Sequence, residues 1–158
     1  MRSDFKVTVS KDYLVFSSAH FITFRGHQCE TLHGHNYRVG VTVEGSVDDE
    51  CLFVVDFSIL KKIVRQLTDE IDHKVLLPVK NPKLAFREVG KHRQVDYFGE
   101  HTYTFPAVDC AMMPIENTTA EMIAQHFAHR TREELAAMGI RNLTAIEMEV
   151  EESFGQSA

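Results

Sequence analysis

The segment Phe16–Tyr37 reads FSSAHFITFRGHQCETLHGHNY and carries four of the nine histidines and one of the three cysteines in this 158-residue chain. His33 and His35 are separated only by Gly34, so in an extended strand both imidazoles point to the same side. His20 lies in the preceding segment, which is also expected to be extended. Three imidazoles in this arrangement are typical of a catalytic zinc site, in which the fourth position stays open to water or substrate.

Cys29 lies four residues before His33, close enough to share such a site. A thiol near a cation ionises more readily, so Cys29 can act as a base or nucleophile. Spacing alone leaves two other interpretations open. Cys29 can be a fourth ligand, which would make the site structural and closed, or it can be a small buried apolar residue. His33 and His35 can likewise be strand residues that face solvent.

Length and composition predict one globular domain, residues 1–158, with 44% hydrophobic and 25% charged residues. The net charge of −6 argues against nucleic-acid binding but leaves room for a local site that binds a phosphorylated substrate. The three cysteines have no framework spacing, and the sequence has neither a membrane-length apolar run nor a signal-peptide core. We therefore expect a cytoplasmic protein that binds neither membranes nor nucleic acid.

Alternation of apolar and polar residues predicts a long or bulged strand, or a hairpin around Lys11-Asp12, over residues 5–20 and a second strand over residues 33–43. The histidine pair extends one face of the second strand. A final strand places the apolar residues of 146–150 on one face, and Glu152 continues that phase. A carboxylate in register with a buried face is costly unless it meets a partner or ligand, although the strand can also have ended by Glu152.

Two helices are expected. A helical period begins at Phe57, after Asp56 as the N-cap, and ends near Asp72. Thr118 as N-cap with Glu121 three residues later predicts a capping box for the second helix. Strands followed by helices in this order indicate an α+β fold, with an antiparallel sheet that carries both helices on one face. Assembly into an oligomer would cover the other face.

Two features permit a functional and a structural interpretation. Asp72 and His73 at the helix end can tune a proton-transfer group or can form a polar helix terminus. Residues 79–116 form a proline-containing, partly basic segment, in which 95–98 and 102–105 can pair as a hairpin. This segment can bind anions, or it can be a solvated loop or oligomer contact.

Several motifs together resemble the 6-pyruvoyltetrahydropterin synthase / 6-carboxytetrahydropterin synthase superfamily. They are FSSAH, C-x-x-x-HGHNY, VVDF before a helix, DH-x-x-LL, TTAE and a final strand ending in Glu, and their order spans most of the chain. The resemblance implies a tunnelling fold (T-fold), a four-stranded antiparallel sheet with two helices on one face. It also implies an oligomeric barrel closed by three subunits, a homohexamer of two stacked trimers, and active sites between subunits.

The same resemblance implies residue roles. His20, His33 and His35 would bind Zn²⁺. Cys29 would be the general base, and Asp72 with His73 would form an acid/base pair. The implied substrate contacts are Glu152 and Thr119 for the pterin ring, with Arg25 and Lys74 as candidates for a triphosphate group.

The implied reaction converts 7,8-dihydroneopterin triphosphate to 6-carboxy-5,6,7,8-tetrahydropterin, acetaldehyde and triphosphate, towards queuosine and other 7-deazapurines. The short spacing from Cys29 to His33 favours this branch, because pyruvoyl-forming relatives tend to have two more residues there. A third branch, which serves folate synthesis, places a Glu near the Cys position. Glu30 is adjacent, but the presence of Cys29 disfavours that branch.

Other classes of function stay open. A non-catalytic T-fold protein that binds pterin or zinc would share the histidines, and a related T-fold enzyme could act on a purine ring. The segment 79–116 departs from compact members of the superfamily as an insertion, and it leaves the substrate and the subunit contacts open.

Overall fold

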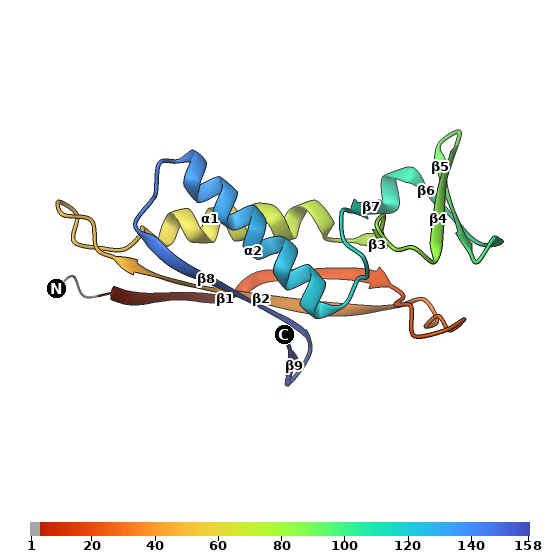
Figure 1. Cartoon of the computed structure of the whole chain (residues 1–158), viewed down its shortest axis with the longest axis horizontal. Helices are drawn as coiled ribbons and strands as arrows, with labels where there is room; N and C mark the ends of the chain where they lie inside the picture. The colour runs from red at the N-terminus through yellow and green to blue at the C-terminus, as the bar shows by residue number, and fades with distance from the viewer. Residues whose placement is uncertain (1–3) are drawn as a thin grey trace.

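The computed structural model describes residues 4–158 as an α+β fold, in which a six-stranded sheet carries two helices on one side (Figure 1). The strand order is β7-β3-β1-β2-β8-β9. These strands are β1 (Asp4–His20), β2 (His33–Ser46), β3 (Lys74–Pro78), β7 (Cys110–Met113), β8 (Leu143–Ser153) and β9 (Gln156–Ser157). Figure 1 shows the sheet nearly edge-on, with α1 (Phe57–Ile71) and α2 (Ala120–Ala137) above it.

β1 is the long, bulged strand that the alternation predicts. It pairs antiparallel with β2, with His20 opposite His33 at one end and a register shift in the middle of the strand. The shift changes the phase of the alternation, so that Val9 before it and Phe16 after it are both buried. The pairing of β1 with β2 thereby brings histidines from separate segments to one place.

The main core lies between the sheet and the helices. Phe16 stacks on Tyr37 with ring centroids 4.4 Å apart, and it meets Phe127 of α2 edge-on at 6.1 Å. The helical stripes expected from the sequence are buried on both helices, except that Phe57 at the start of α1 is 56% exposed. Their buried apolar residues are Leu60, Ile63, Val64, Leu67 and Ile71 on α1 and Ala120, Ile123, Ala124, Phe127 and Leu135 on α2.

The sheet is mixed, and the expected four-stranded antiparallel sheet was in this respect wrong. β3 lies parallel to β1, and β7 lies parallel to β3. β3 begins as soon as α1 has ended, and Leu76 and Leu77 within it are fully buried. The prolines near both short strands mask their strand character in the sequence, because proline cannot donate to a ladder.

The second helix begins one residue later than predicted. Thr119 is its N-cap, and the Thr119 Oγ1 accepts a hydrogen bond of 3.3 Å from the amide of Met122. The capping box expected of Thr118 and Glu121 was therefore wrong. Thr118 is instead buried and donates its hydroxyl to the carbonyl of Phe21 at 3.2 Å, a distant partner that a local pattern cannot predict.

The segment 79–116 contains a separate antiparallel sheet at one end of the molecule (Figure 1). Its strands are β4 (Leu84–Val89), β5 (His92–Tyr97) and β6 (Glu100–Pro106), and a short 3-10 helix η1 (Ala107–Asp109) leads into β7. The predicted hairpin is confirmed as β5 and β6, whereas β4 was not predicted. This sheet encloses a second small core with Phe21 and Leu77.

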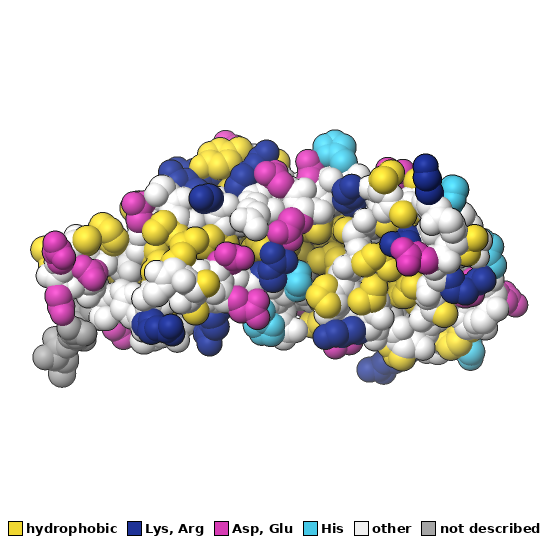
Figure 2. Space-filling model, turned by 90° about the horizontal axis from the view of Figure 1, so that it is seen from above, with side chains coloured by type: hydrophobic (Ala, Val, Ile, Leu, Met, Phe, Trp, Pro, Cys, Tyr) yellow, Lys and Arg dark blue, Asp and Glu magenta, His cyan; other side chains and the backbone are white. Residues whose placement is uncertain are grey.

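The helix-covered face carries interspersed acidic and basic side chains rather than a patch of one sign (Figure 2). Among residues 4–158, no helix is both long and apolar enough to cross a membrane.

Candidate metal centre

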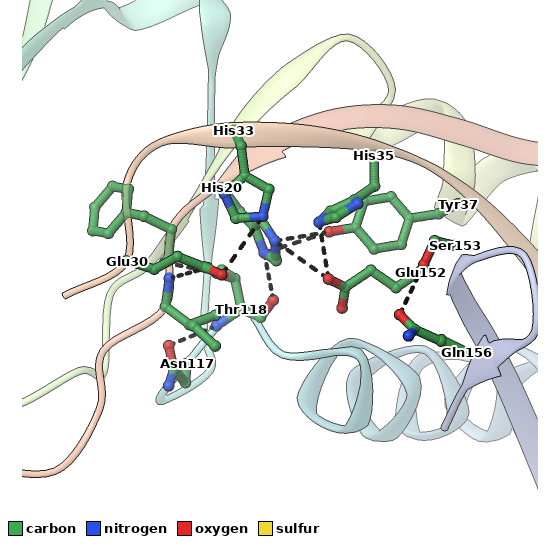
Figure 3. Close-up of polar contacts among 12 residues, drawn as sticks. His20, Glu30, His33, His35, Tyr37, Asn117, Thr118, Glu152, Ser153 and Gln156 are labelled. Atoms are coloured by element: carbon green, nitrogen blue, oxygen red, sulfur yellow. Dashed lines mark hydrogen bonds and ion pairs between the residues drawn. The ribbon is translucent and has the colours of Figure 1, made fainter.

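Three histidines and one glutamate converge on a single point (Figure 3). One potential ligand atom from each of His20, His33, His35 and Glu152 lies within 4.8 Å of all the others. His20 ends β1, His33 and His35 begin β2, and Glu152 is near the end of β8. The cluster therefore depends on the register by which β2 pairs with β1 on one side and with β8 on the other.

Backbone carbonyls orient two of the imidazoles. The Nδ1 of His20 lies 2.8 Å from the carbonyl oxygen of Thr118, and the Nδ1 of His33 lies 2.7 Å from that of Thr31. A ring nitrogen that donates to a carbonyl leaves the other nitrogen as an acceptor, which is the usual way that proteins orient a metal-ligating histidine. Both Nε2 atoms are then available to a cation.

His20 is almost completely buried, with 1% of its surface exposed. Burial lowers the pKa of His20, although the Thr118 carbonyl and the charge of Glu152 oppose the shift. The neutral imidazole is the form that binds a metal. The hydroxyl oxygen of Tyr37 lies 3.4 Å from both ring nitrogens of His20, so it closes the inner side of the cluster.

His35 supplies the test of whether this cluster suits a metal ion. Its Nε2 is buried and makes no hydrogen bond within residues 4–158, although it lies 2.9 Å from the Oε1 of Glu152. A buried polar atom without a hydrogen bond is costly, and a cation at this point would satisfy it. Imidazole nitrogens with one carboxylate oxygen are donors that suit Zn²⁺. The residues present therefore fit the metal.

Glu152 has two possible places in such a site. Its Oε1 lies 2.9 Å from the Nε2 of His35 and 3.8 Å from that of His20, so the carboxylate can complete four protein ligands. It can also bind an organic ligand that enters beside the metal. The first arrangement is a closed site, and the second leaves the open position that catalysis needs.

Cys29 and Glu30 face different surroundings. Cys29 packs against the small core that Phe21 shares with the insertion, and burial, followed by the charge of Glu30, raises the pKa of its thiol. Glu30 turns towards the histidines, with its Oε1 3.7 Å from the Nε2 of His33, and its Oε2 accepts a hydrogen bond of 3.2 Å from the amide of Ile22. Sequence reasoning gave Glu30 no role at the metal. The available signal was that neighbours in extended backbone point to opposite sides.

Asp72 and His73 form a hydrogen-bonded pair that is not part of the four-residue cluster. Asp72 accepts a hydrogen bond of 2.7 Å from the amide of Ser17, and its other oxygen lies 2.9 Å from the Nδ1 of His73. Burial raises the pKa of Asp72, but these hydrogen bonds outweigh it and lower that pKa overall. The His73 side chain is 81% exposed and borders a hollow of about 510 Å³, which Lys74 and His35 also line.

The other residues proposed to bind the substrate differ in whether their side chains already have a hydrogen-bond partner. The hydroxyl of Thr119 caps α2, and the ammonium group of Lys74 donates to the carbonyl of Val108. Arg25 is exposed on the loop between β1 and β2. Several cations of the insertion have partners of their own, which weakens the anion-binding interpretation of this segment. They are Lys83 with loop carbonyls, Arg87 with Asp96, and Arg93 with Glu88.

Comparison with known proteins identifies the family of this chain. Residues 8–158 match the sequence profile of the family described as 6-pyruvoyl tetrahydropterin synthase. The chain belongs to this family. It is thus a lyase of the 6-pyruvoyl and 6-carboxy tetrahydropterin synthases, as the sequence motifs predict.

Relatives represent both branches of the family. A Methanocaldococcus jannaschii protein, provisionally named 6-carboxy-5,6,7,8-tetrahydropterin synthase, is 39% identical over 92% of this chain and 88% of its own length. The 6-pyruvoyl tetrahydropterin synthase of Plasmodium falciparum superposes with a TM-score of 0.90 at 36% identity, covering 99% of this chain and 96% of its own. A Plasmodium vivax 6-pyruvoyltetrahydropterin synthase with a catalytic glutamate replaced superposes with a TM-score of 0.89 at 33% identity, with the same coverage.

Proposed function

We propose that this protein is a zinc-dependent lyase that converts 7,8-dihydroneopterin triphosphate and water to 6-carboxy-5,6,7,8-tetrahydropterin, acetaldehyde and triphosphate. The observation that carries the proposal is the convergence of His20, His33 and His35 with the carboxylate of Glu152. The short spacing between Cys29 and His33 and the 39% identity to the M. jannaschii protein support the carboxy branch. The product would enter the synthesis of queuosine and other 7-deazapurines.

The three histidines would hold Zn²⁺, which when bound stabilises negative charge that develops on a side-chain oxygen of the substrate. Glu152 would accept hydrogen bonds from the pterin ring, with help from the backbone around Thr119. Cys29 would remove a side-chain proton and His73, oriented by Asp72, would return one. Arg25 and Lys74 are the proposed contacts of the triphosphate.

The Asp72–His73 pair bears on whether the active site is shared between copies of the chain. Asp72 and His73 are not members of the cluster formed by the histidines and Glu152. We therefore propose that the Asp72–His73 pair of one subunit serves the metal site of a neighbour. This arrangement agrees with the homohexamer that the family resemblance implies. The cysteine usage of the sequence supports a cytoplasmic location for the proposed enzyme.

The position of Glu30 favours a second candidate function. If Glu30 rather than Cys29 is the base, the protein belongs to the branch that serves folate synthesis and yields a different pterin. The distance of 3.7 Å between Glu30 and His33 supports this candidate, as does the catalytic glutamate of the P. vivax enzyme.

A product assay tests these alternatives. Zinc-loaded protein would be incubated with 7,8-dihydroneopterin triphosphate, and the pterins and acetaldehyde would be identified by mass. Acetaldehyde with 6-carboxytetrahydropterin is the expected result. A pyruvoyl product without acetaldehyde would move the protein to the pyruvoyl branch, and a third pterin would favour the Glu30 candidate. No product from folded, zinc-loaded protein would leave a non-catalytic zinc- or pterin-binding role.

A further inference from the structure

The insertion and the loop of residues 21–32 are connected by more than apolar packing. Asn81, at the start of the insertion, donates a hydrogen bond of 2.9 Å from its Nδ2 to the Oγ1 of Thr23. Lys83 donates to the carbonyls of Phe24 and Gly26, the latter at 2.9 Å. The insertion thus holds the half of the loop opposite the Cys29–Glu30 pair.

Thr23 links the insertion to Cys29 and Glu30, the two candidate bases. It forms an antiparallel β-bridge with Cys29, so the position of one backbone fixes that of the other. The segment before α2 holds Thr23 as well, because the Thr23 amide donates to the Oδ1 of Asn117 at 3.3 Å and the Thr23 carbonyl accepts from its Nδ2 at 3.1 Å. Thr23 is therefore fixed from the insertion and from the approach to α2.

The bond from Asn81 is built into the fold. Asn81 is only 5% exposed, and its Oδ1 accepts a hydrogen bond of 2.9 Å from the amide of Lys83. A buried amide that loses one partner keeps the cost of its desolvation. The Nδ2 of Asn81 is thus held in its hydrogen bond to Thr23. A shift of the insertion at Asn81 would therefore strain the loop of residues 21–32.

The same approach to α2 also holds the metal site. Asn117 binds Thr23, and the adjacent Thr118 binds the Nδ1 of His20 through its carbonyl. The distance between the candidate bases and the metal ligands is consequently set by Thr23 and the two asparagines. Thr23 is bonded to Asn81, Asn117 and the backbone of Cys29 rather than to a histidine, so displacing it should move Cys29 and Glu30 more than the three histidines.

We infer that the insertion positions the Cys29–Glu30 loop for catalysis, and that Thr23 is the positioning residue through which Asn81 acts. The inference deepens the proposed function, on which it rests, and gives the segment 79–116 a role at the active site of its own chain. It predicts that weakening the bond between Asn81 and Thr23 affects turnover and leaves metal binding intact.

The matched pair Thr23→Val and Thr23→Ser tests this role. Valine preserves the shape of threonine and removes the acceptor, whereas serine retains the acceptor. Thr23→Val should lower kcat about tenfold, with unchanged KM and zinc content, because a small displacement of a base is costly. In Thr23→Val, iodoacetamide should label Cys29 about fivefold faster. Labelling requires the loop to open, and the loop opens more often when its closed form has lost one hydrogen bond. Thr23→Ser should resemble the wild type.

Thr8→Val is the control, because the hydroxyl of Thr8 lies 2.9 Å from that of Thr42 on an exposed part of the sheet. Its kcat should not change. Equal kcat for Thr23→Val and Thr23→Ser would overturn the inference, as would loss of zinc from Thr23→Val. If the wild type turns over no pterin, the proposed function fails, and an unchanged labelling rate of Cys29 would separately overturn the positioning role. Should Thr23→Val not fold, Asn81→Ala removes the donor to Thr23, together with the acceptor of the Lys83 amide, and is judged by the same outcomes.

Discussion

The Oε1 of Glu30 lies 3.7 Å from the Nε2 of His33, while the side chain of Cys29, one residue earlier, packs beneath the insertion. Neighbouring side chains in extended backbone point to opposite sides, so only one of the two can face the histidines in a given loop conformation. Which residue can act as the base thus depends on the conformation of the loop as well as on the residue types.

Cys29→Ala should retain zinc and lose turnover by about 10²–10⁴-fold, the usual cost of removing a general base. His33→Ala should lose both zinc and turnover, because it removes a proposed ligand. Zinc measured by mass spectrometry and initial rates separate the two effects. Loss of zinc from Cys29→Ala would show that Cys29 is a ligand in a closed site. Near-normal turnover of Cys29→Ala with inactive Glu30→Gln would assign the base to Glu30.

Glu152→Gln should keep its zinc and raise the KM for the pterin at least tenfold, because the charged acceptor for the pterin ring is lost. The Oε1 of Glu152 lies 2.9 Å from the Nε2 of His35, so the competing expectation is that Glu152 ligates the metal. His35→Ala serves as the comparison, because it should lose zinc. Equal loss of zinc from both variants would contradict the pterin-binding role of Glu152.

Mixing two inactive variants tests whether the active site is shared between subunits. Cys29→Ala keeps an intact Asp72–His73 pair, and His73→Ala keeps an intact metal site and Cys29. If the pair serves a neighbouring subunit, co-refolded hybrids should recover part of the wild-type rate, whereas each variant alone stays inactive. Mixing without refolding provides the control. Hybrids no more active than the separate variants would place His73 in the site of its own subunit or outside the reaction.

Asp72 should make folding stability depend on pH in acid. Its pKa is lowered in the folded protein, so its contribution is complete above the pKa of the unfolded chain, near 3.9, and is lost as pH falls through the folded value. The wild type should therefore melt higher than Asp72→Asn at pH 6, and the difference should shrink below about pH 4. Thermal melts across this range check it. A difference that grows on acidification would contradict the assignment.

Gly45 lies where β2 meets the start of β8, and it leaves no room for a side chain. A Cβ at this position would lie 2.3 Å from the carbonyl oxygen of Asn142, whereas at Gly40 of the same strand the nearest atom would be 3.7 Å away. Gly45→Ala should therefore cost about 1–3 kcal/mol of unfolding free energy. Gly40→Ala should be neutral or slightly stabilising. Urea unfolding compares them, and equal midpoints would refute the steric argument.

The sequence determined the local elements of this protein and the chemistry of its centre. Apolar periodicity predicts β1, β2, β8 and both helices, because each buries one face against the same core. The His-x-His spacing places two imidazoles on one side of a strand whatever the partner strands are. The motifs around His20, Cys29 and Asp72 identify the family, which the comparisons confirm.

Tertiary structure decided what depends on contacts between distant segments. Three such contacts join residues that are far apart in the chain, so no local period encodes them. They are the parallel pairing of β3 with β7, the hydrogen bond of the buried Thr118 to Phe21, and the hydrogen bond of Asn81 to Thr23. Cys29 packs against the small core that includes residues of the insertion, and Glu30 turns towards His33. The sequence thus determines which groups are available, whereas contacts between distant segments place Glu30 beside His33 and Cys29 in the small core.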